Sequence, residues 1–254
     1  MVCLKVLITG ASSGIGKSLA IEFSKLGYDL VLVARNLERL KDLKKNIEND
    51  CKVEIYSMDL TVVDNCIALH KKVKDIDILI NNAGFGLCGE FVELSLGHEL
   101  EMLDTNIKAL HILMKLYLKD MLKKDQGQIL NVASIAGFMS GPLMSTYYAT
   151  KNYVVSLSEG IREELYHQGS KVSVSILCPG PVETNFDKVA GVDFSLTAVS
   201  SEMVAKCAIK GLQKKKFYIV PGMKISFLRI ISRLVPRSLL VKLVYFQQKK
   251  KKSV

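Results

Sequence analysis

The sequence predicts an α/β domain with a doubly wound parallel sheet of seven strands and helices on both faces. Short apolar runs alternate with amphipathic helical patterns from near the first residue to about residue 220. Such alternation is typical of strand–helix–strand units, whose strands run parallel and are covered on both sides. With 254 residues, 49% of them hydrophobic and 24% charged, the chain is long and apolar enough for one core, and global disorder is excluded.

The first part of the chain alternates four strands with three helices. Ile15, Leu19 and Phe23 recur at helical spacing. Gly27 ends that helix, and Asn36 is a candidate N-cap of the next. The expected elements are strand 4–9, helix 14–27, strand 28–34, helix 36–50, strand 52–58, helix 62–73 and strand 76–81.

The second part continues the alternation with three more strands. The pattern predicts one long helix at 98–122, strand 128–134, helix 146–167, strand 171–178, helix 202–212 and strand 217–220. No internal repeat or linker divides this region. We therefore expect a single domain over residues 1–222, followed by an extension over residues 223–254.

The cysteines and the start of the chain favour a cytoplasmic protein. The six cysteines are scattered and contain no C-x-x-C pair, which argues for reduced thiols and against a disulfide framework or a metal site. The first residues lack the basic region and the apolar run of a signal peptide.

The net charge of +10 is concentrated at the carboxyl end. Residues 203–254 contain 14 Lys and Arg residues and no Asp or Glu, whereas residues 1–202 carry a net charge of −4. The body therefore lacks the basic surface that nucleic-acid binding requires, and no nucleic-acid partner is expected.

A glycine-rich turn follows the first strand. The segment "TGASSGIG" (9–16) joins that strand to the first helix. Such a turn lets backbone N–H groups and the helix dipole face a pyrophosphate, although a plain tight turn also uses glycine. We interpret the segment as a dinucleotide site.

The end of the second strand favours NADP over NAD. The strand ends in "LVARN", with neutral Ala34 followed by Arg35. A carboxylate near this position suits a free ribose hydroxyl, whereas a guanidinium can bind a 2′-phosphate through two hydrogen bonds. The alternative is that Arg35 is a solvated loop charge.

Five motifs together resemble the short-chain dehydrogenase/reductase family. They are "TGASSGIG" (9–16), "NNAG" (81–84), Asn106 in "LDTNIKAL", Ser134 in "NVASIAG" and the segment "YYATK" (147–151). They occur in the family's order, and the resemblance covers about residues 4–220. It implies a Rossmann-type fold and hydride transfer between a nicotinamide and a carbonyl or secondary alcohol.

Two adjacent tyrosines compete for the role of catalytic acid. In a helix, Tyr147 and Tyr148 both share a face with Lys151, so helical spacing leaves the choice open. The family's pattern is Tyr-x-x-x-Lys with a serine thirteen residues before the tyrosine. Tyr147 matches it with Ser134 and Lys151, so Tyr148 becomes a packing or pocket-wall residue.

The resemblance also implies the remaining roles. Tyr147 would deliver a proton, Ser134 would hydrogen-bond the carbonyl oxygen, and the Lys151 ammonium would favour the phenolate. Asn106 would hold a water in a relay to Lys151. The implied cofactor contacts are Gly10, Ser12, Ser13, Gly14, Ile15, Gly16, Arg35, Asp59, Leu60, Asn82, Ala83, Gly84, Tyr147, Lys151, Pro179, Gly180, Val182 and Thr184. Asp59 and Thr184 could instead cap helices.

The segments beyond Thr184 carry the information on substrate and partners. The family varies its substrate lid here, and the apolar residues Phe186, Val189, Val192 and Phe194 indicate an apolar substrate. The basic extension has an apolar stripe on each side of Pro236. This is typical of a peripheral membrane segment, but also of a tail that packs on the body or on a second subunit, or that binds an acidic carrier protein.

The sequence as a whole predicts an NADPH-dependent reductase of ketones or secondary alcohols, with a 3-oxoacyl, steroid-like or other lipidic substrate. The alternatives are an NAD-dependent alcohol dehydrogenase of the same family and a non-catalytic, membrane-associated nucleotide sensor. The expected partners are a small carbonyl compound and other copies of the chain, in a homodimer or homotetramer built on helices 98–122 and 146–167.

Overall fold

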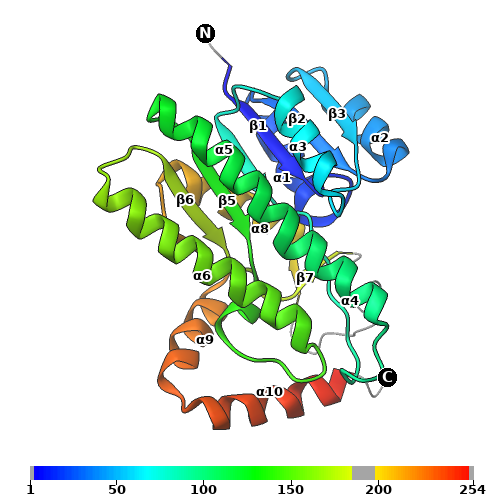
Figure 1. Ribbon diagram of the computed structural model, residues 1–254, viewed down its shortest axis with the longest axis vertical. Coiled ribbons are helices and arrows are strands. Elements are labelled where there is room, and N and C mark those ends of the chain that lie inside the picture. Colours follow the sequence, from blue (N-terminus) through cyan, green and yellow to red (C-terminus); the bar gives the residue numbers. More distant parts are fainter. Residues whose placement is uncertain (1–2, 185–197, 252–254) are drawn as a thin grey trace.

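A seven-stranded parallel sheet forms the centre of the computed structural model, which describes residues 3–184 and 198–251 (Figure 1). The strand order is β3-β2-β1-β4-β5-β6-β9. The chain therefore adds strands on one side of β1 as far as β3, and on the other side of β1 from β4 onward, so the order of addition reverses between β1 and β4. The strands are β1 Lys5–Thr9, β2 Asp29–Ala34, β3 Val53–Ser57, β4 Ile78–Asn81, β5 Gln128–Val132, β6 Ser173–Leu177 and β9 Tyr218–Ile219. The doubly wound sheet of seven parallel strands is thereby confirmed.

Helices cover both faces of the sheet because its central strands are apolar on both sides. One face packs on α1 Gly14–Ser24, α2 Leu37–Ile47 and α8 Ser201–Gln213. The other face packs on α3 Val63–Lys72, α5 Leu110–Lys124 and α6 Ser145–His167. Tyr117 and Phe23 are the largest fully buried side chains, one from each side.

The long helix expected at 98–122 is interrupted. It consists of α4 Leu96–Leu103, the π-helical turn η1 Asp104–Ala109 and α5. Periodicity does not reveal such a turn, because one widened turn shifts the register of the apolar residues only slightly. The turn contains Asn106, which is buried.

Two short strands were not expected from the sequence. β7 Val182–Glu183 pairs in parallel with β8 Val199–Ser200 beside the main sheet. The apolar residues expected in the substrate lid, Phe186, Val189, Val192 and Phe194, lie outside the described residues.

The basic extension forms two helices that pack against the body. α9 Met223–Leu234 and α10 Arg237–Lys251 are separated at Pro236 and lie across the end of the molecule at which β5 and β6 finish (Figure 1). α9 contacts the 3₁₀ turn η2 Ile135–Phe138, and Leu240 and Val244 of α10 pack on Met139. The boundary at residue 222 stays a prediction.

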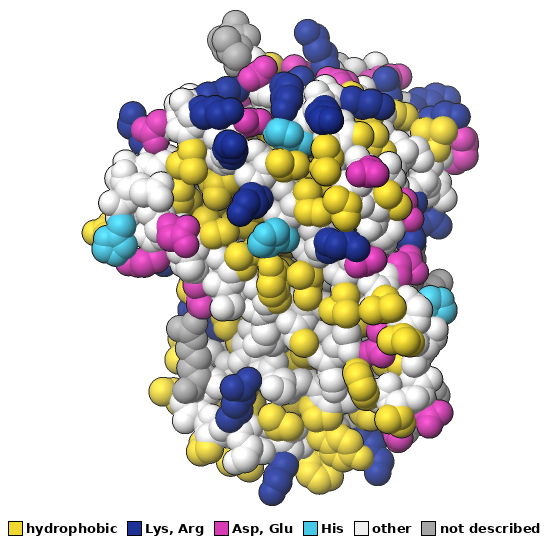
Figure 2. All heavy atoms as spheres, viewed as in Figure 1, with side chains coloured by type: hydrophobic (Ala, Val, Ile, Leu, Met, Phe, Trp, Pro, Cys, Tyr) yellow, Lys and Arg dark blue, Asp and Glu magenta, His cyan; other side chains and the backbone are white. Residues whose placement is uncertain are grey.

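The outward side of these two helices is apolar and basic. Figure 2 shows hydrophobic side chains and Lys or Arg at this end of the molecule. The exposed apolar residues of the two helices include Met223, Phe227, Leu234, Leu243 and Phe246. Within the described residues, no helix combines the length and the apolar character that crossing a bilayer requires.

Candidate active site

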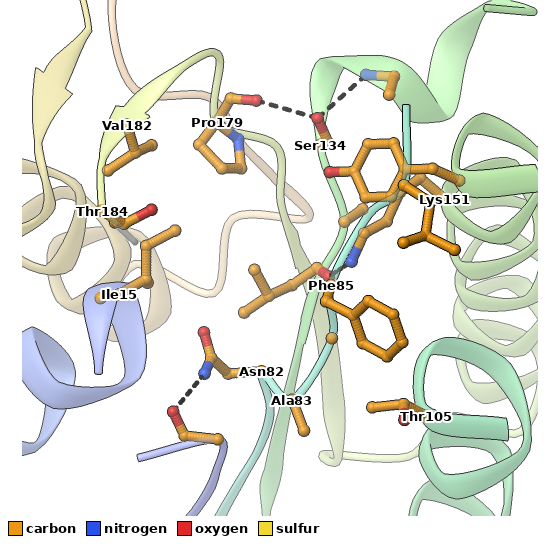
Figure 3. A pocket seen from close by; sticks show the side chains of 18 of the residues that line it. Ile15, Asn82, Ala83, Phe85, Thr105, Ser134, Lys151, Pro179, Val182 and Thr184 are labelled. Atoms are coloured by element: carbon orange, nitrogen blue, oxygen red, sulfur yellow. Dashed lines mark hydrogen bonds between the residues drawn. The ribbon is translucent and has the colours of Figure 1, made fainter. Parts of the chain in front are cut away.

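A cavity of about 780 Å³ opens at the carboxyl ends of the strands, beside the reversal between β1 and β4 (Figure 3). In open α/β sheets this position is where ligands bind. Most of the residues expected at the site line the cavity. They are Gly10, Ser12, Ser13, Gly14, Ile15, Arg35, Asp59, Leu60, Asn82, Ala83, Gly84, Ser134, Tyr147, Lys151, Pro179, Gly180, Val182 and Thr184.

The ends of β1 and β4 are locked together at one side of the cavity. The Thr9 hydroxyl accepts hydrogen bonds from the backbone N–H groups of Asn82 and Ala83, at 3.0 Å each. The Asn82 side-chain amide donates to the carbonyl groups of Thr9 and Gly10. The Gly10 carbonyl can take this position because Gly10 has φ +66°, which a residue with a Cβ adopts only at a cost.

Gly16 is one of the expected cofactor contacts, but it does not line the cavity. A Cβ on Gly16 would lie 2.4 Å from the Gly10 carbonyl oxygen and 2.5 Å from Asn82 Nδ2. The glycine therefore allows α1 to approach β1 closely. Its structural part is to position the glycine-rich loop, and a role in cofactor binding stays a prediction.

The first turn of α1 lies at the cavity, which Ser13, Gly14 and Ile15 line. The Ser13 side chain does not cap the helix, and the first turn contains no acidic residue. The N-terminus of this helix can therefore hold a phosphate group through its N–H groups and its dipole. Thr184, on the opposite wall, is within contact distance of a Cβ placed on Gly14.

Two arginines lie at the rim, one of which the sequence reasoning missed. The Arg35 guanidinium is 2.6 Å from the Glu101 carboxylate, and Arg35 is the more exposed of the two. Arg39 also lines the cavity, one helical turn beyond the Asn36 N-cap of α2. The sequence signal that could have identified Arg39 is its position four residues after Arg35.

Asp59 does not cap α3, whose N-cap is Val62, and its expected contact with the cofactor stays a prediction. Its carboxylate accepts hydrogen bonds from the backbone N–H and the hydroxyl of Thr61, so it closes the turn before α3, and it also lines the cavity. Burial would raise the pKa of Asp59, but the Thr61 hydrogen bonds and the charge of Arg35 outweigh it and lower the pKa.

Ser134, Tyr147 and Lys151 converge at the inner end of the cavity. Ser134 lies two residues beyond the end of β5, as the N-cap of η2, and the other two lie on α6 (Figure 3). A hydrogen bond links the Ser134 and Tyr147 hydroxyls, and Lys151 Nζ is 5.8 Å from the centre of the Tyr147 ring. The Lys151 ammonium donates to the Val132 carbonyl at 2.9 Å.

Burial controls the protonation of this cluster. Burial lowers the pKa of Lys151 to about 8. Burial also raises the pKa of Tyr147 well above its usual value, against a smaller opposing effect of the Ser134 hydrogen bond. The lowering of the Tyr147 pKa expected from the Lys151 charge is therefore not what this structure shows, and the tyrosine hydroxyl keeps its proton at neutral pH.

Asn106 lies behind the cavity wall. Its side-chain amide donates to the Phe85 carbonyl and the Thr150 hydroxyl, and its oxygen accepts from the Phe85 N–H group. Both donor hydrogens of the amide are therefore used within the protein, whereas its oxygen can accept a second hydrogen bond, so the water expected at Asn106 stays a prediction. The amide oxygen lies 2.8 Å from a Cβ placed on Gly84, so Asn106 fixes the wall next to Lys151.

The other end of the cavity is walled by residues that the sequence reasoning did not assign. Phe85, Leu87, Met139 and Met144 contribute apolar surface. Tyr148 also lines the cavity, as expected for a wall residue. The extension closes this end, with the residues Leu228, Val244, Gln247 and Gln248. Periodicity identified their helices but gave no signal for this packing.

Comparison with known proteins agrees with this geometry. Residues 4–193 match the short chain dehydrogenase family. An NADP-dependent 3-hydroxy acid dehydrogenase of Schizosaccharomyces pombe is 34% identical over 192 residues, which cover 72% of this chain and 73% of that protein. Estradiol 17-beta-dehydrogenase 11 of Pongo abelii is 31% identical over 241 residues, 92% of this chain and 80% of that protein.

A solved structure is similar over most of the chain as well. The short-chain dehydrogenase from Sphingobium yanoikuyae in complex with NADPH has a TM-score of 0.81 and 33% identity, and the match covers 87% of this chain and 88% of that one. The family match extends over more than half of the chain and includes the glycine loop and the serine, tyrosine and lysine of the cavity. This chain is therefore an oxidoreductase of the short-chain dehydrogenase/reductase family.

Proposed function

We propose that the chain is an NADPH-dependent reductase of ketones that have an apolar body. The observation that carries this proposal is the cluster of half-buried Ser134 with buried Tyr147 and Lys151 at the inner end of a cavity whose rim carries Arg35. A carbonyl in the cavity would lie against two hydroxyl groups, and a dinucleotide would extend from there to the guanidinium.

The residues of the cavity fit a nicotinamide dinucleotide. The glycine turn and the open N-terminus of α1 would hold the pyrophosphate. Asp59, Leu60, Asn82 and Ala83 would form the adenosine wall, and Gly84 would continue it. Lys151 would bind the nicotinamide ribose, and Pro179, Gly180, Val182 and Thr184 would surround the ring. When bound, the reduced nicotinamide supplies hydride.

Tyr147 would provide the proton that completes the reduction. Its hydroxyl is buried, and its raised pKa keeps it protonated at neutral pH. Ser134 would donate a hydrogen bond to the carbonyl oxygen while negative charge develops on it. The protonated form that reduction requires is therefore the populated one at neutral pH, which supports testing the protein in the direction of reduction first.

Arg35 would select NADPH over NADH. A guanidinium binds a 2′-phosphate through paired hydrogen bonds, and Arg39 on the adjacent turn would add a second positive charge. Glu101 holds Arg35 in the structure and would have to release it. The bound cofactor of the Sphingobium yanoikuyae protein and the name of the Schizosaccharomyces pombe protein support this preference.

An apolar substrate fits the walls beyond Tyr147. Phe85, Leu87, Met139 and Met144 leave little polar surface there. The two named relatives act, by their names, on a 3-hydroxy acid and on a steroid. Both names refer to compounds with a hydroxyl group, which is the group that reduction of a carbonyl forms, so 3-oxoacyl and steroid-like ketones are the first substrates to try.

The test is a pair of fluorescence titrations with NADPH and NADH, followed by ketone reduction. We expect NADPH to bind at least about tenfold more tightly, and Tyr147→Phe to abolish turnover while NADPH still binds. Equal or tighter binding of NADH would favour an NAD-dependent alcohol dehydrogenase. Full NADPH binding without any turnover would favour a nucleotide sensor.

Assembly and membrane contact belong to the same proposal. α5 and α6 lie next to each other on one face of the molecule, where they would form a homodimer or homotetramer (Figure 1).

The outward side of α9 and α10 exposes Phe227, Leu234, Leu243 and Phe246, and the extension contains no acidic residue. We expect this side to bind anionic lipid. Light scattering tests the assembly, and sedimentation with phosphatidylserine vesicles against phosphatidylcholine vesicles tests the contact.

A further inference from the structure

The contact between Tyr148 and Gln248 joins the body of the protein to α10 inside the cavity wall. Gln248 Nε2 donates to the Tyr148 hydroxyl oxygen at 2.7 Å, across 100 residues of sequence. Both residues line the cavity, and only 2% of Gln248 is exposed. A polar side chain that is buried this fully normally has all its hydrogen bonds satisfied.

Gln248 does not meet that expectation. Its Oε1 atom is buried and has no hydrogen-bond partner among the described residues. A buried acceptor without a partner is unfavourable, because it has lost its hydrogen bonds to water and has gained none within the protein. The torsion that orients a glutamine amide is broad, so a small rotation can turn the oxygen toward a donor within the cavity.

The surroundings of the pair distinguish it from the rest of this end of the cavity. Tyr148 packs in two apolar clusters, one with Tyr147 and Met144 and the other with Met139 and Val244. The Tyr147 and Tyr148 rings are 6.1 Å apart. The unsatisfied Oε1 atom of Gln248 therefore lies beyond Tyr147, and apolar side chains of the cavity wall lie between the two.

We propose that Gln248 is a specificity-determining residue that accepts a hydrogen bond from a hydroxyl group on the far end of the substrate. The inference rests on the proposed reductase function and extends it. The preferred substrate is then a ketone whose apolar body carries a hydroxyl donor at the end remote from the carbonyl. A ketone without this hydroxyl leaves the acceptor unsatisfied and binds more weakly.

The experiment uses the full chain and linear methyl ketones from heptanone to undecanone, each paired with the analogue that bears a hydroxyl on its last carbon. For at least one chain length we expect the wild type to prefer the hydroxylated ketone by about tenfold in kcat/KM, mainly through KM. Gln248→Leu should reduce this preference to about twofold or less, and Tyr148→Phe should weaken it because Gln248 loses its anchor.

Lys242→Leu is the matched control. Lys242 lies on the same helix α10, is exposed and does not line the cavity, so its replacement should keep the hydroxyl preference. The melting temperature of each variant distinguishes a change in specificity from a loss of α10 packing. The Tyr148→Phe variant removes the same hydrogen bond by changing the partner residue on α6 and leaves α10 unchanged.

A binding measurement separates this inference from the proposed function. In the Tyr147→Phe variant loaded with NADPH, the dissociation constants of each ketone pair can be compared without turnover. Tighter binding of the hydroxylated member supports the role of Gln248 even if no ketone is reduced. Equal binding of both members at every chain length, or an unchanged preference in Gln248→Leu, would overturn the inference.

Discussion

The two ends of the cavity are built by different means. The nucleotide end is made of short loops that directly follow β1, β2 and β4, and its shape depends on backbone positions such as Gly10 and Gly16. The substrate end is made of side chains from segments far apart in the chain, among them Tyr148 and Gln248. The first end depends on local backbone geometry, and the second depends on the packing of α9 and α10.

Gly16→Ala would break the nucleotide end and is expected to have the largest effect. The added Cβ would lie 2.4 Å from the Gly10 carbonyl oxygen, so either the loop or α1 must move. We expect a loss of about 3 kcal/mol in the free energy of unfolding, together with weaker NADPH binding. Urea unfolding and a nucleotide titration measure both effects.

Gly160→Ala is the control for this substitution. Gly160 lies in α6, and a Cβ there meets no atom within 4 Å. The substitution should stabilise the protein by about 0.5–1 kcal/mol, because alanine loses less conformational entropy in a helix. A Gly16→Ala variant as stable as Gly160→Ala would refute the close approach of α1 to β1.

Lys151 lies where the two ends of the cavity meet, and its protonation makes the stability of the folded protein depend on pH. Its pKa is about 8 in the folded protein, below the ordinary lysine value that applies to the unfolded chain. Between about pH 8 and 10 the unfolded chain therefore binds more protons than the folded protein, and stability rises with pH. Relative to Lys151→Met, the wild type should gain about 2 kcal/mol over this interval.

The measurement is urea unfolding of both proteins at pH 7, 8, 9 and 10. Tyr147 begins to contribute near pH 10, where about half of the unfolded chains have lost this proton, but both proteins contain Tyr147, so its effect cancels in the comparison. Parallel pH profiles for the wild type and Lys151→Met would show that folding does not lower the pKa of Lys151.

Leu240→Ala tests whether the substrate end can be loosened by itself. Leu240 packs with Met139 and Val244 and is 8% exposed. We expect a local loss of about 2 kcal/mol that weakens the packing of α10, with faster amide exchange in α10 and a higher KM for ketones. NADPH affinity should stay unchanged, whereas an equal loss at the nucleotide end would show that the two ends are coupled.

Glu101→Gln should have the smallest effect. It tests whether Arg35 at the nucleotide end discriminates between NADPH and NADH. It frees Arg35 and removes a negative charge near the expected 2′-phosphate, so NADPH binding should tighten about three- to tenfold at low salt. NADH binding should change little, because NADH lacks that phosphate. An equal gain for both nucleotides would remove Arg35 and Glu101 from the discrimination.

The sequence by itself determined the sheet, the order of its helices, the family and most of the cavity lining. These features are local: apolar alternation specifies strands and helices, and the loop residues at strand ends are adjacent in sequence to the strands that position them. The resemblance identified Ser134, Tyr147 and Lys151, all three of which line one cavity.

Only the tertiary structure decided what lies behind and opposite these residues. The π-helical turn that buries Asn106, the pairing of Arg35 with Glu101, and the packing of Gln248 on Tyr148 all depend on contacts between distant segments. The sequence left several positions open for the basic extension. The structure packs its inner side over the cavity, because the residues Leu240 and Val244 bury apolar surface there, while its outer side stays exposed.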